Sequence, residues 1–260
     1  MDATLAQLML AVLSGGVVAL LLTLFGGGGS VLAVPLLLYV VGVQDPHVAI
    51  GASAAGVALN ALTALVGQAR AGRVRWPCAL LFAGTGAAGA VTGSSVAKAI
   101  DGHALLIFFA LAMGLVALAM LRPGAPVGAE NVRLTPAMAP RIAASGAGVG
   151  LAAGFFGIGG GFLIVPGLMS AAGMTLALAQ ASSLVSVAAF GAATAGNYAL
   201  SGLIDWPIVS AMAAGGVAGT LAGLPLARRL GSNAMLGRRL FAGLILIVAV
   251  YVAIKAVTTL

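Results

Sequence analysis

Charged side chains are scarce in this sequence. Asp, Glu, Lys and Arg together make up 7% of its 260 residues, whereas 62% are hydrophobic. A soluble domain carries about a quarter charged residues, so this chain has too few to cover a water-facing surface. Residues 142–204 contain no charged side chain, which leaves room for about three membrane spans of ~20 residues each. The apolar runs are continuous rather than alternating, so the sequence predicts an all-α polytopic membrane protein.

Cysteine and acidic residues are also nearly missing. The single cysteine, Cys78, excludes an internal disulfide and a cysteine-based metal cage. None of the five acidic residues lies deep inside an apolar segment, so the sequence offers no carboxylate proton relay. No HExxH, GxSxG or Walker A pattern occurs. We therefore expect no enzymatic activity, no cofactor and no metal.

The basic residues lie between the apolar runs. Twelve Lys and Arg give a net charge of +7, which in a soluble protein would suggest nucleic acid as a partner. Here they flank hydrophobic segments, which is typical of topology determinants that face anionic lipid. The N-terminus lacks the basic region of a cleaved signal peptide, so we expect the first apolar run to belong to the mature protein. The sequence therefore predicts a multi-pass protein of the plasma (inner) membrane, with the bilayer as a partner and no nucleic acid.

The sequence repeats itself at an offset of about 130 residues. The run FGGGGSVLAVP at 25–35 aligns with FGIGGGFLIVP at 156–166, at an offset of 131. Gly, Trp and Pro at 72–77 match the same residue types at 202–207, at an offset of 130. These matches predict two homologous transmembrane repeats, residues 1–125 and 141–260, joined by a cytoplasmic linker over residues 126–140.

Each half contains five apolar segments separated by turn or charge signals. The second segment of each half has only 13 or 14 residues and covers about 20 Å, less than the ~30 Å hydrocarbon layer. We therefore expect 8–10 membrane segments in total, depending on whether the short ones span or re-enter. The segments run about 5–25, 30–43, 47–68, 77–99 and 104–121 in the first half, and 142–156, 161–173, 175–200, 207–227 and 236–257 in the second.

The loop that is rich in basic residues has a different position in each half. In the first half, three arginines lie at 70–75, between the third and fourth segments; in the second, four lie at 228–239, between the fourth and fifth. Because positive loops stay on the cytoplasmic side, this exchange predicts inverted repeats with an odd number of crossings each. Five crossings, or three plus a re-entrant pair, put every basic loop inside and both termini outside.

A duplicated glycine cluster opens the short second segment of each half. Glycines at the start of an intramembrane helix present unpaired N–H groups at its positive dipole end, and their size lets an anion approach the backbone. Short, interrupted segments at matching positions of two halves indicate a transporter's substrate site. The alternative is that these glycines only permit close helix packing. The candidate binding residues here are Gly28, Gly29, Ser30, Gly159, Gly160 and Gly161.

Polar side chains gather on one face of the third segment in each half. Such a face on an apolar helix indicates a wet cavity or another helix, and hydrogen bonding within or between helices is the alternative. Because these groups are neutral and donate hydrogen bonds, they suit a small oxyanion better than a metal cation. The candidate binding residues on this segment are Ser53, Asn60, Ser182, Ser183, Ser186 and Asn197.

The fourth segments carry glycines at every fourth position. This spacing places small residues along one helix face and predicts close helix contact rather than a binding role. The glycines concerned are Gly89, Gly93, Gly215, Gly219 and Gly223.

Three repeated features carry a family resemblance over nearly the whole chain. They are the Gly-rich stretches ending in Val-Pro at 34–35 and 165–166, the serines that follow, and the Gly-to-Trp turns. With them the chain resembles the TauE/SafE sulfite-exporter family. The resemblance implies a plasma-membrane secondary carrier that exports small sulfur-containing or organic anions such as sulfite and sulfonates. Members of that family are drawn with eight spans, whereas the charge pattern favours an odd number per half.

The first half departs from the family pattern after its Gly-rich stretch. It reads Ala52-Ser53-Ala54 where Thr-Ser-Leu is usual, whereas the second half has Ser182-Ser183-Leu184. We predict a secondary transporter, an exporter of a small anion, that works by alternating access around a midplane site. The alternatives are an anion channel and a membrane scaffold subunit for a sulfur-metabolising partner, in which Cys78 is the candidate for sulfur chemistry. The sequence leaves the anion, the coupling ion and the oligomeric state open.

Overall fold

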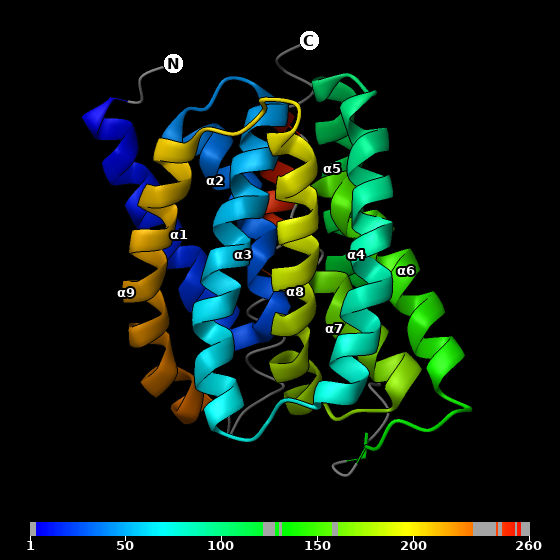
Figure 1. Cartoon of the computed structure of the whole chain (residues 1–260). Coiled ribbons are helices and arrows are strands. Elements are labelled where there is room, and N and C mark those ends of the chain that lie inside the picture. Colours follow the sequence, from blue (N-terminus) through cyan, green and yellow to red (C-terminus); the bar gives the residue numbers. More distant parts are fainter. Residues whose placement is uncertain are drawn as a thin grey trace.

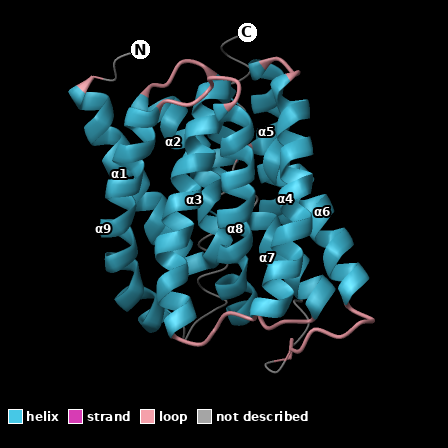
Figure 2. Ribbon diagram, in the orientation of Figure 1, coloured by secondary structure: helices cyan, strands magenta, loops and turns pink. Residues whose placement is uncertain are grey.

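The computed structural model of the protein describes residues 4–121, 128–129, 132–157, 161–230, 243, 246–252 and 254–255. Those residues form helices joined by short loops and contain no strand, so the predicted all-α class is confirmed (Figures 1 and 2). Most of the predicted last segment, 236–257, lies outside the described residues. The first half contains α1 (Leu5–Phe25), the 3-10 helix η1 (Gly26–Leu32), α2 (Ala33–Leu36), the π-helix η2 (Leu37–Val41), α3 (Pro46–Arg70), α4 (Trp76–Lys98) and α5 (Gly102–Leu121). The second contains α6 (Ala139–Phe156), α7 (Gly161–Ala172), α8 (Leu176–Ala199) and α9 (Trp206–Leu230).

The bundle carries its apolar side chains on the outside. Five stretches of the described chain are long and apolar enough to cross a membrane: Leu5–Val41, α3, α4, α8 and most of α9. On their outer faces, large side chains such as Leu221 are 64% exposed, whereas the serines of α3 and α8 are buried. A hydrocarbon solvent permits this distribution, because apolar side chains lose nothing by facing lipid. The protein is therefore a multi-pass membrane protein.

Glycine stops the first helix of each half. Gly26 has a φ of 63°, a conformation that side chains with a Cβ avoid, and α1 ends at Phe25 before it. In the second half α6 ends at Phe156, Gly157 has a φ of 65°, and α7 begins at Gly161. The predicted interruption of the chain at both glycine clusters is confirmed.

The glycines with positive φ occur in matched pairs. Among the described residues, six glycines have φ values between 63° and 81°. Every one in the first half has a counterpart in the second at the repeat offset of 131 or 130 residues. The two halves therefore repeat their backbone conformation as well as their sequence. The pairs are Gly26 with Gly157, Gly42 with Gly173, and Gly72 with Gly202.

The two halves are intertwined through equivalent helix pairs. The first helix of each half packs along the fourth helix of the other, α1 on α9 and α6 on α4, and α3 packs against α8 between these pairs (Figure 1). Glycines make the outer pairs close. A Cβ on Gly219 of α9 would come 2.8 Å from the Cα of Gly16 in α1, and a Cβ on Gly93 of α4 would come 2.9 Å from the carbonyl carbon of Leu151 in α6. The predicted role of the fourth-segment glycines in helix contact is confirmed.

Equivalent helices run in opposite directions through the bundle. In Figure 1, α1 starts at the upper end and α6 starts at the lower end. The loop 71–75 and the end of α9 lie at the lower end with the start of α6, and the loops 42–45, 99–101 and 200–205 lie at the upper end. The described basic loops thus share one end, while three of the five acidic residues lie in loops at the other.

Replacing Gly93 by leucine is expected to destabilise the protein. The new side chain meets the backbone of Leu151, and overpacking of this kind typically lowers the free energy of unfolding by about 1–3 kcal/mol. Gly84, also on α4, has open space around it, so Gly84→Leu is the matched control and should leave stability unchanged. Thermal unfolding in detergent measures the difference, and equal melting temperatures for the two variants would contradict the close α4–α6 contact.

Candidate functional site

The break after α1 crosses the start of α7 inside the bundle. The 3-10 helix η1 is buried along its whole length and packs against α7 and α8. A Cβ on Gly27 would lie 2.7 Å from the Cα of Gly161, the first residue of α7. No side chain larger than hydrogen fits between these backbones. The structure therefore brings the start of α7 and the break after α1 into direct contact.

Helix α8 supplies a side-chain partner to this crossing. The Ser183 hydroxyl accepts a hydrogen bond from the backbone N–H of Gly27 (2.9 Å) and donates one to the carbonyl of Gln180 (2.7 Å). A Cβ on Gly27 would also lie 2.8 Å from the side chain of Val187, one turn further along α8. One stripe of α8 thus covers the glycine turn, and Ser183 satisfies one of its buried N–H groups.

The second half makes the equivalent approach to the first. A Cβ on Gly26 would lie 2.8 Å from the Cα of Gln180, and a Cβ on Gly157 would lie 3.0 Å from the Cβ of Ile50. Gly157 and Ile50 are the repeat counterparts of Gly26 and Gln180 at offsets of 131 and 130. Each glycine break therefore packs on the third helix of the opposite half, and the pattern of contacts is pseudo-symmetric.

The predicted glycine-cluster residues have different neighbours. Gly28, Gly29 and Ser30 are all buried in η1. A Cβ on Gly29 would lie 2.8 Å from the Cβ of Leu21, so this glycine serves close packing on α1. The Ser30 hydroxyl donates to the carbonyl of Gly27 (2.9 Å) and stabilises the 3-10 turn from within. Gly159 and Gly160 lie outside the described residues.

Two of the predicted serines are buried without a hydrogen-bond partner among the described residues. The hydroxyls of Ser53 on α3 and Ser186 on α8 are fully enclosed, and neither makes a hydrogen bond to any residue that the structure describes. Ser53 is the repeat counterpart of Ser183, and Ser186 lies one turn beyond Ser183 on α8, on the same side of that helix. An unsatisfied buried hydroxyl typically costs about 1–3 kcal/mol. The described residues therefore leave the hydrogen-bonding capacity of these two hydroxyls unused.

Asn60 lies at a three-helix contact further along α3. It is about 10 Å from Ser53 along the helix. Its amide nitrogen donates to the carbonyl of Gly15 on α1 (3.3 Å), and a Cβ on Gly216 of α9 would come 2.9 Å from the same nitrogen. The Asn60 amide oxygen is buried with no partner in the described part of the chain. Asn60 therefore joins α1, α3 and α9 and keeps one acceptor unused.

The other two predicted residues on α8 have partners on α4 or directly before it. The Ser182 hydroxyl accepts the backbone N–H of Arg75 (3.0 Å), just before α4 begins. Asn197 lies about 21 Å beyond Ser183 along α8. Its amide nitrogen donates to the Ser94 hydroxyl (2.7 Å) of α4. The structure does not bring Asn197 to the glycine crossing.

Lys98 is a functional candidate that the sequence analysis missed. Its ammonium donates to the Asn197 amide oxygen (2.9 Å) and the Ser201 hydroxyl (2.8 Å), and lies 5.8 Å from the ring centre of Tyr198. These contacts fasten the end of α4 to the end of α8 at the upper end of the bundle. In the sequence, Lys98 is one of the basic residues that flank apolar runs, and no local pattern indicates that it binds Asn197. Gly27 was also passed over in favour of its neighbours, because nothing local marks which glycine N–H meets a serine.

A bundle whose two halves meet at broken helices, with buried polar groups around the crossing, is typical of membrane transporters. The chain belongs to the TauE/SafE sulfite exporter family, whose model matches residues 11–252. It is 45% identical over 250 residues to a protein of Xylella fastidiosa named "Probable membrane transporter protein", which covers 96% of both chains. It is 26% identical over 229 residues to a Bacillus subtilis protein named "Probable membrane transporter protein YunE", over 80% of this chain and 84% of that one. No solved structure matches this chain.

Replacing Ser183 by alanine is expected to destabilise the glycine crossing. The change leaves the buried N–H of Gly27 without its acceptor, which typically lowers the free energy of unfolding by about 1–3 kcal/mol. Ser210→Ala is the control, because the exposed Ser210 hydroxyl donates only to the carbonyl of Pro207 in its own helix. Thermal unfolding and hydrogen exchange of the Gly27 amide check the prediction. Unchanged protection of that amide in Ser183→Ala would show that the hydrogen bond contributes nothing.

Proposed function

We propose that this protein is a secondary transporter that exports a small sulfur-containing or organic anion, such as sulfite or a sulfonate, across the plasma membrane. The anion binds near the middle of the bilayer, where the glycine break of one half meets the start of α7 in the other. The protein moves its substrate without changing it chemically. The observation that carries this proposal is the pair of enclosed hydroxyls of Ser53 and Ser186, which have no hydrogen-bond partner among the described residues. Ser53 lies one turn after Ile50, which contacts Gly157, and Ser186 lies one turn after Ser183, which binds Gly27.

The hydrogen-bonding groups at the crossing suit an oxyanion. Backbone N–H groups at a helix start and serine hydroxyls all donate, and the positive end of the helix dipole favours negative charge. In the structure, the Ser183 oxygen accepts a hydrogen bond from the N–H of Gly27. It therefore occupies the position that an oxygen of a bound anion would take. When a substrate enters, rotation of the serine frees that N–H for the ligand.

The buried state of η1 supports a carrier rather than an open channel. Gly26–Leu32 are enclosed by the surrounding helices, and a conducting pore through the crossing would expose them. At the upper end, the Lys98 contacts hold α4 against α8. Alternating access then requires these contacts to break when the site opens to that end.

Inverted repeats explain both the arrangement of the helices and the placement of charge. Equivalent helices start at opposite ends of the bundle, and the described basic loops lie at one end (Figure 1). By the positive-inside rule this end is cytoplasmic. The repeats then span residues 1–125 and 141–260, with the linker 126–140 inside. Rocking of one repeat against the other around the crossing gives two equivalent half-cycles.

Transport should depend on hydroxyls that the fold does not need. Ser53→Ala and Ser186→Ala remove no hydrogen bond within the described protein, so thermal stability should be unchanged or higher. If each hydroxyl donates to a charged substrate, its loss removes about 1.5–3 kcal/mol, a decrease of roughly 10- to 100-fold in substrate affinity. The measurement is the concentration dependence of labelled sulfite flux in proteoliposomes, with sulfonates and chloride as competitors.

Ser14→Ala provides the matched control for that experiment. Ser14 is also buried with an unpartnered hydroxyl, but it lies on α1 about 16 Å along the helix before Phe25. Its replacement should leave transport unchanged. If all three alanine variants bind sulfite with the affinity of the unaltered protein, Ser53 and Ser186 are not part of the site. Flux that does not saturate and shows no counter-transport would favour a channel instead.

The side of each loop can be tested with single cysteines. Cys78 is the single cysteine of the sequence, so a Cys78→Ser background leaves only the introduced thiols. In that background Arg73→Cys and Arg229→Cys should both react with an impermeant reagent from the cytoplasmic side. Ser201→Cys, in the loop at the opposite end, should react from the outside. Labelling of positions 73 and 229 from opposite sides would contradict inverted repeats.

A further inference from the structure

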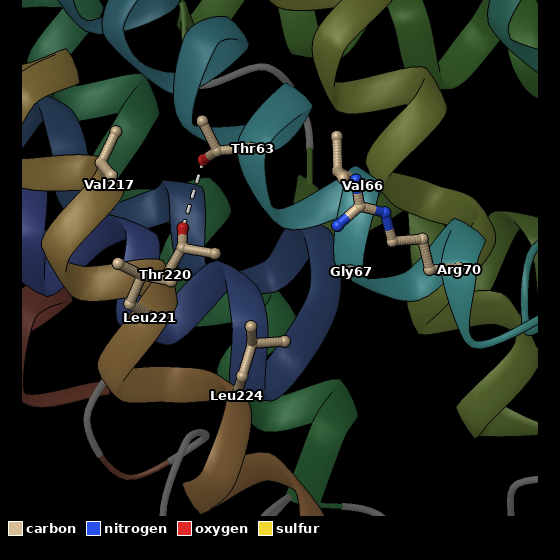
Figure 3. Close-up of a pocket in the computed structure, with 8 residues that line it drawn as sticks. All are labelled: Thr63, Val66, Gly67, Arg70, Val217, Thr220, Leu221 and Leu224. Atoms are coloured by element: carbon tan, nitrogen blue, oxygen red, sulfur yellow. Dashed lines mark hydrogen bonds between the residues drawn. The ribbon is translucent and has the colours of Figure 1, made fainter.

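A groove between α3 and α9 lies outside the transport site. It has a volume of about 180 Å³, and Thr63, Val66, Gly67 and Arg70 line it from α3. Val217, Thr220, Leu221 and Leu224 line it from α9 (Figure 3). Val66 and Val217 are 50% and 49% exposed, so the groove opens on the outer, membrane-facing surface of the bundle.

The groove presents apolar surface to an occupant. Its two hydroxyls, Thr63 and Thr220, lie 3.2 Å apart and hydrogen bond to each other, and the Thr63 hydroxyl also donates to the carbonyl of Asn60 (2.7 Å). Figure 3 shows the two hydroxyls facing each other between α3 and α9. Their hydrogen bonds are already made within the protein, and apart from Arg70 the remaining lining is hydrocarbon. A hydrated ion gains little from such a surface, whereas an acyl chain fits it.

The guanidinium of Arg70 lies at one end of this apolar groove. Arg70 is the last residue of α3, where the span reaches the membrane interface, and Figure 3 shows its guanidinium turned back toward the groove. Within the described residues it makes no ion pair. A guanidinium binds a phosphate through two parallel hydrogen bonds, and basic residues at the cytoplasmic interface attract anionic lipid.

The equivalent place in the other half is closed by polar contacts. Gly67 and Leu224 correspond to Asn197 and Ser94 at the repeat offset, and these two hydrogen bond between α8 and α4 (2.7 Å). Gly67 has no side chain to fill the space, and the nearest atom to a Cβ built on it is a methyl of Leu224 at 3.0 Å. The groove is thus a feature of the α3–α9 pair and not of both repeats.

We infer that the α3–α9 groove binds an anionic phospholipid, with an acyl chain between Val66 and Leu221 and the headgroup phosphate on Arg70. This inference does not depend on the identity of the transported anion. It places a lipid between the third helix of one half and the fourth helix of the other. A bound lipid there fastens the basic end of α3 to α9, as Lys98 fastens the opposite end of α4 to α8.

Native mass spectrometry of the detergent-purified full chain tests this inference. Phosphatidylglycerol and phosphatidylcholine with the same acyl chains are added at equal concentration. The unaltered protein should retain phosphatidylglycerol at least threefold better. Arg70→Gln should lose this preference, while Arg73→Gln, an exposed arginine of the adjacent loop that does not line the groove, should keep it. Equal losses in both variants would show unspecific surface attraction and overturn the inference.

Two further arms separate the acyl chain from the phosphate. Gly67→Leu fills the groove and should reduce retention of both lipids at least threefold, with Gly84→Leu as the control at a position with open space. Thermal unfolding shows whether Gly67→Leu is folded; if it is folded and binds lipid normally, the groove is not the site. Inorganic phosphate at millimolar concentration should not displace phosphatidylglycerol. Displacement by phosphate would reassign Arg70 to a site for free anions.

Discussion

The contact between Gly27 and Gly161 constrains the rest of this structure. Two backbones pass so closely that neither residue can carry a side chain, and the break in each first helix follows from the glycines that make this possible. The crossing buries backbone N–H groups inside a membrane-spanning bundle, so each needs an acceptor. Ser183 supplies one for Gly27, and this fixes how α8 is placed against the turn. The centre of the bundle is therefore polar because its backbone is irregular there.

The helix pairs around the crossing also join one half of the chain to the other. Each half places its first helix on the fourth helix of the other, and glycines let these pairs approach closely. The third helices, α3 and α8, are left to meet in the middle and carry the buried serines. This arrangement is compatible with the proposed transport cycle, because both halves contribute backbone and side chains to the crossing. The lipid groove between α3 and α9 and the Lys98 contacts between α4 and α8 lie at the two ends of these interfaces, where such a motion would be largest.

Much of the local structure could be predicted from the sequence. The glycine breaks were predicted correctly, and helices such as Leu5–Phe25 and Gly161–Ala172 begin and end within a residue of the predicted segments. These features depend on short-range effects: a glycine with positive φ ends a helix, and a Trp-Pro pair begins one. The repeat added further information, since a signal that occurs twice in register is stronger than either copy. The predicted inversion and the predicted linker stay predictions, supported by the opposite directions of α1 and α6.

The sequence by itself determined that the chain crosses a membrane, that it has two homologous halves and where each half breaks its first helix. Those properties depend on composition and on residues close together in the chain. Only the tertiary structure decided which polar atoms are paired. Gly27 meets Ser183, Asn197 binds Lys98 far from the crossing, and Ser53 and Ser186 have no hydrogen-bond partner within the described part of the chain. Each of these depends on how helices more than 20 residues apart in the chain are rotated and shifted against one another. A helical face in the sequence shows which side chains point the same way, but the neighbouring helix determines what they meet.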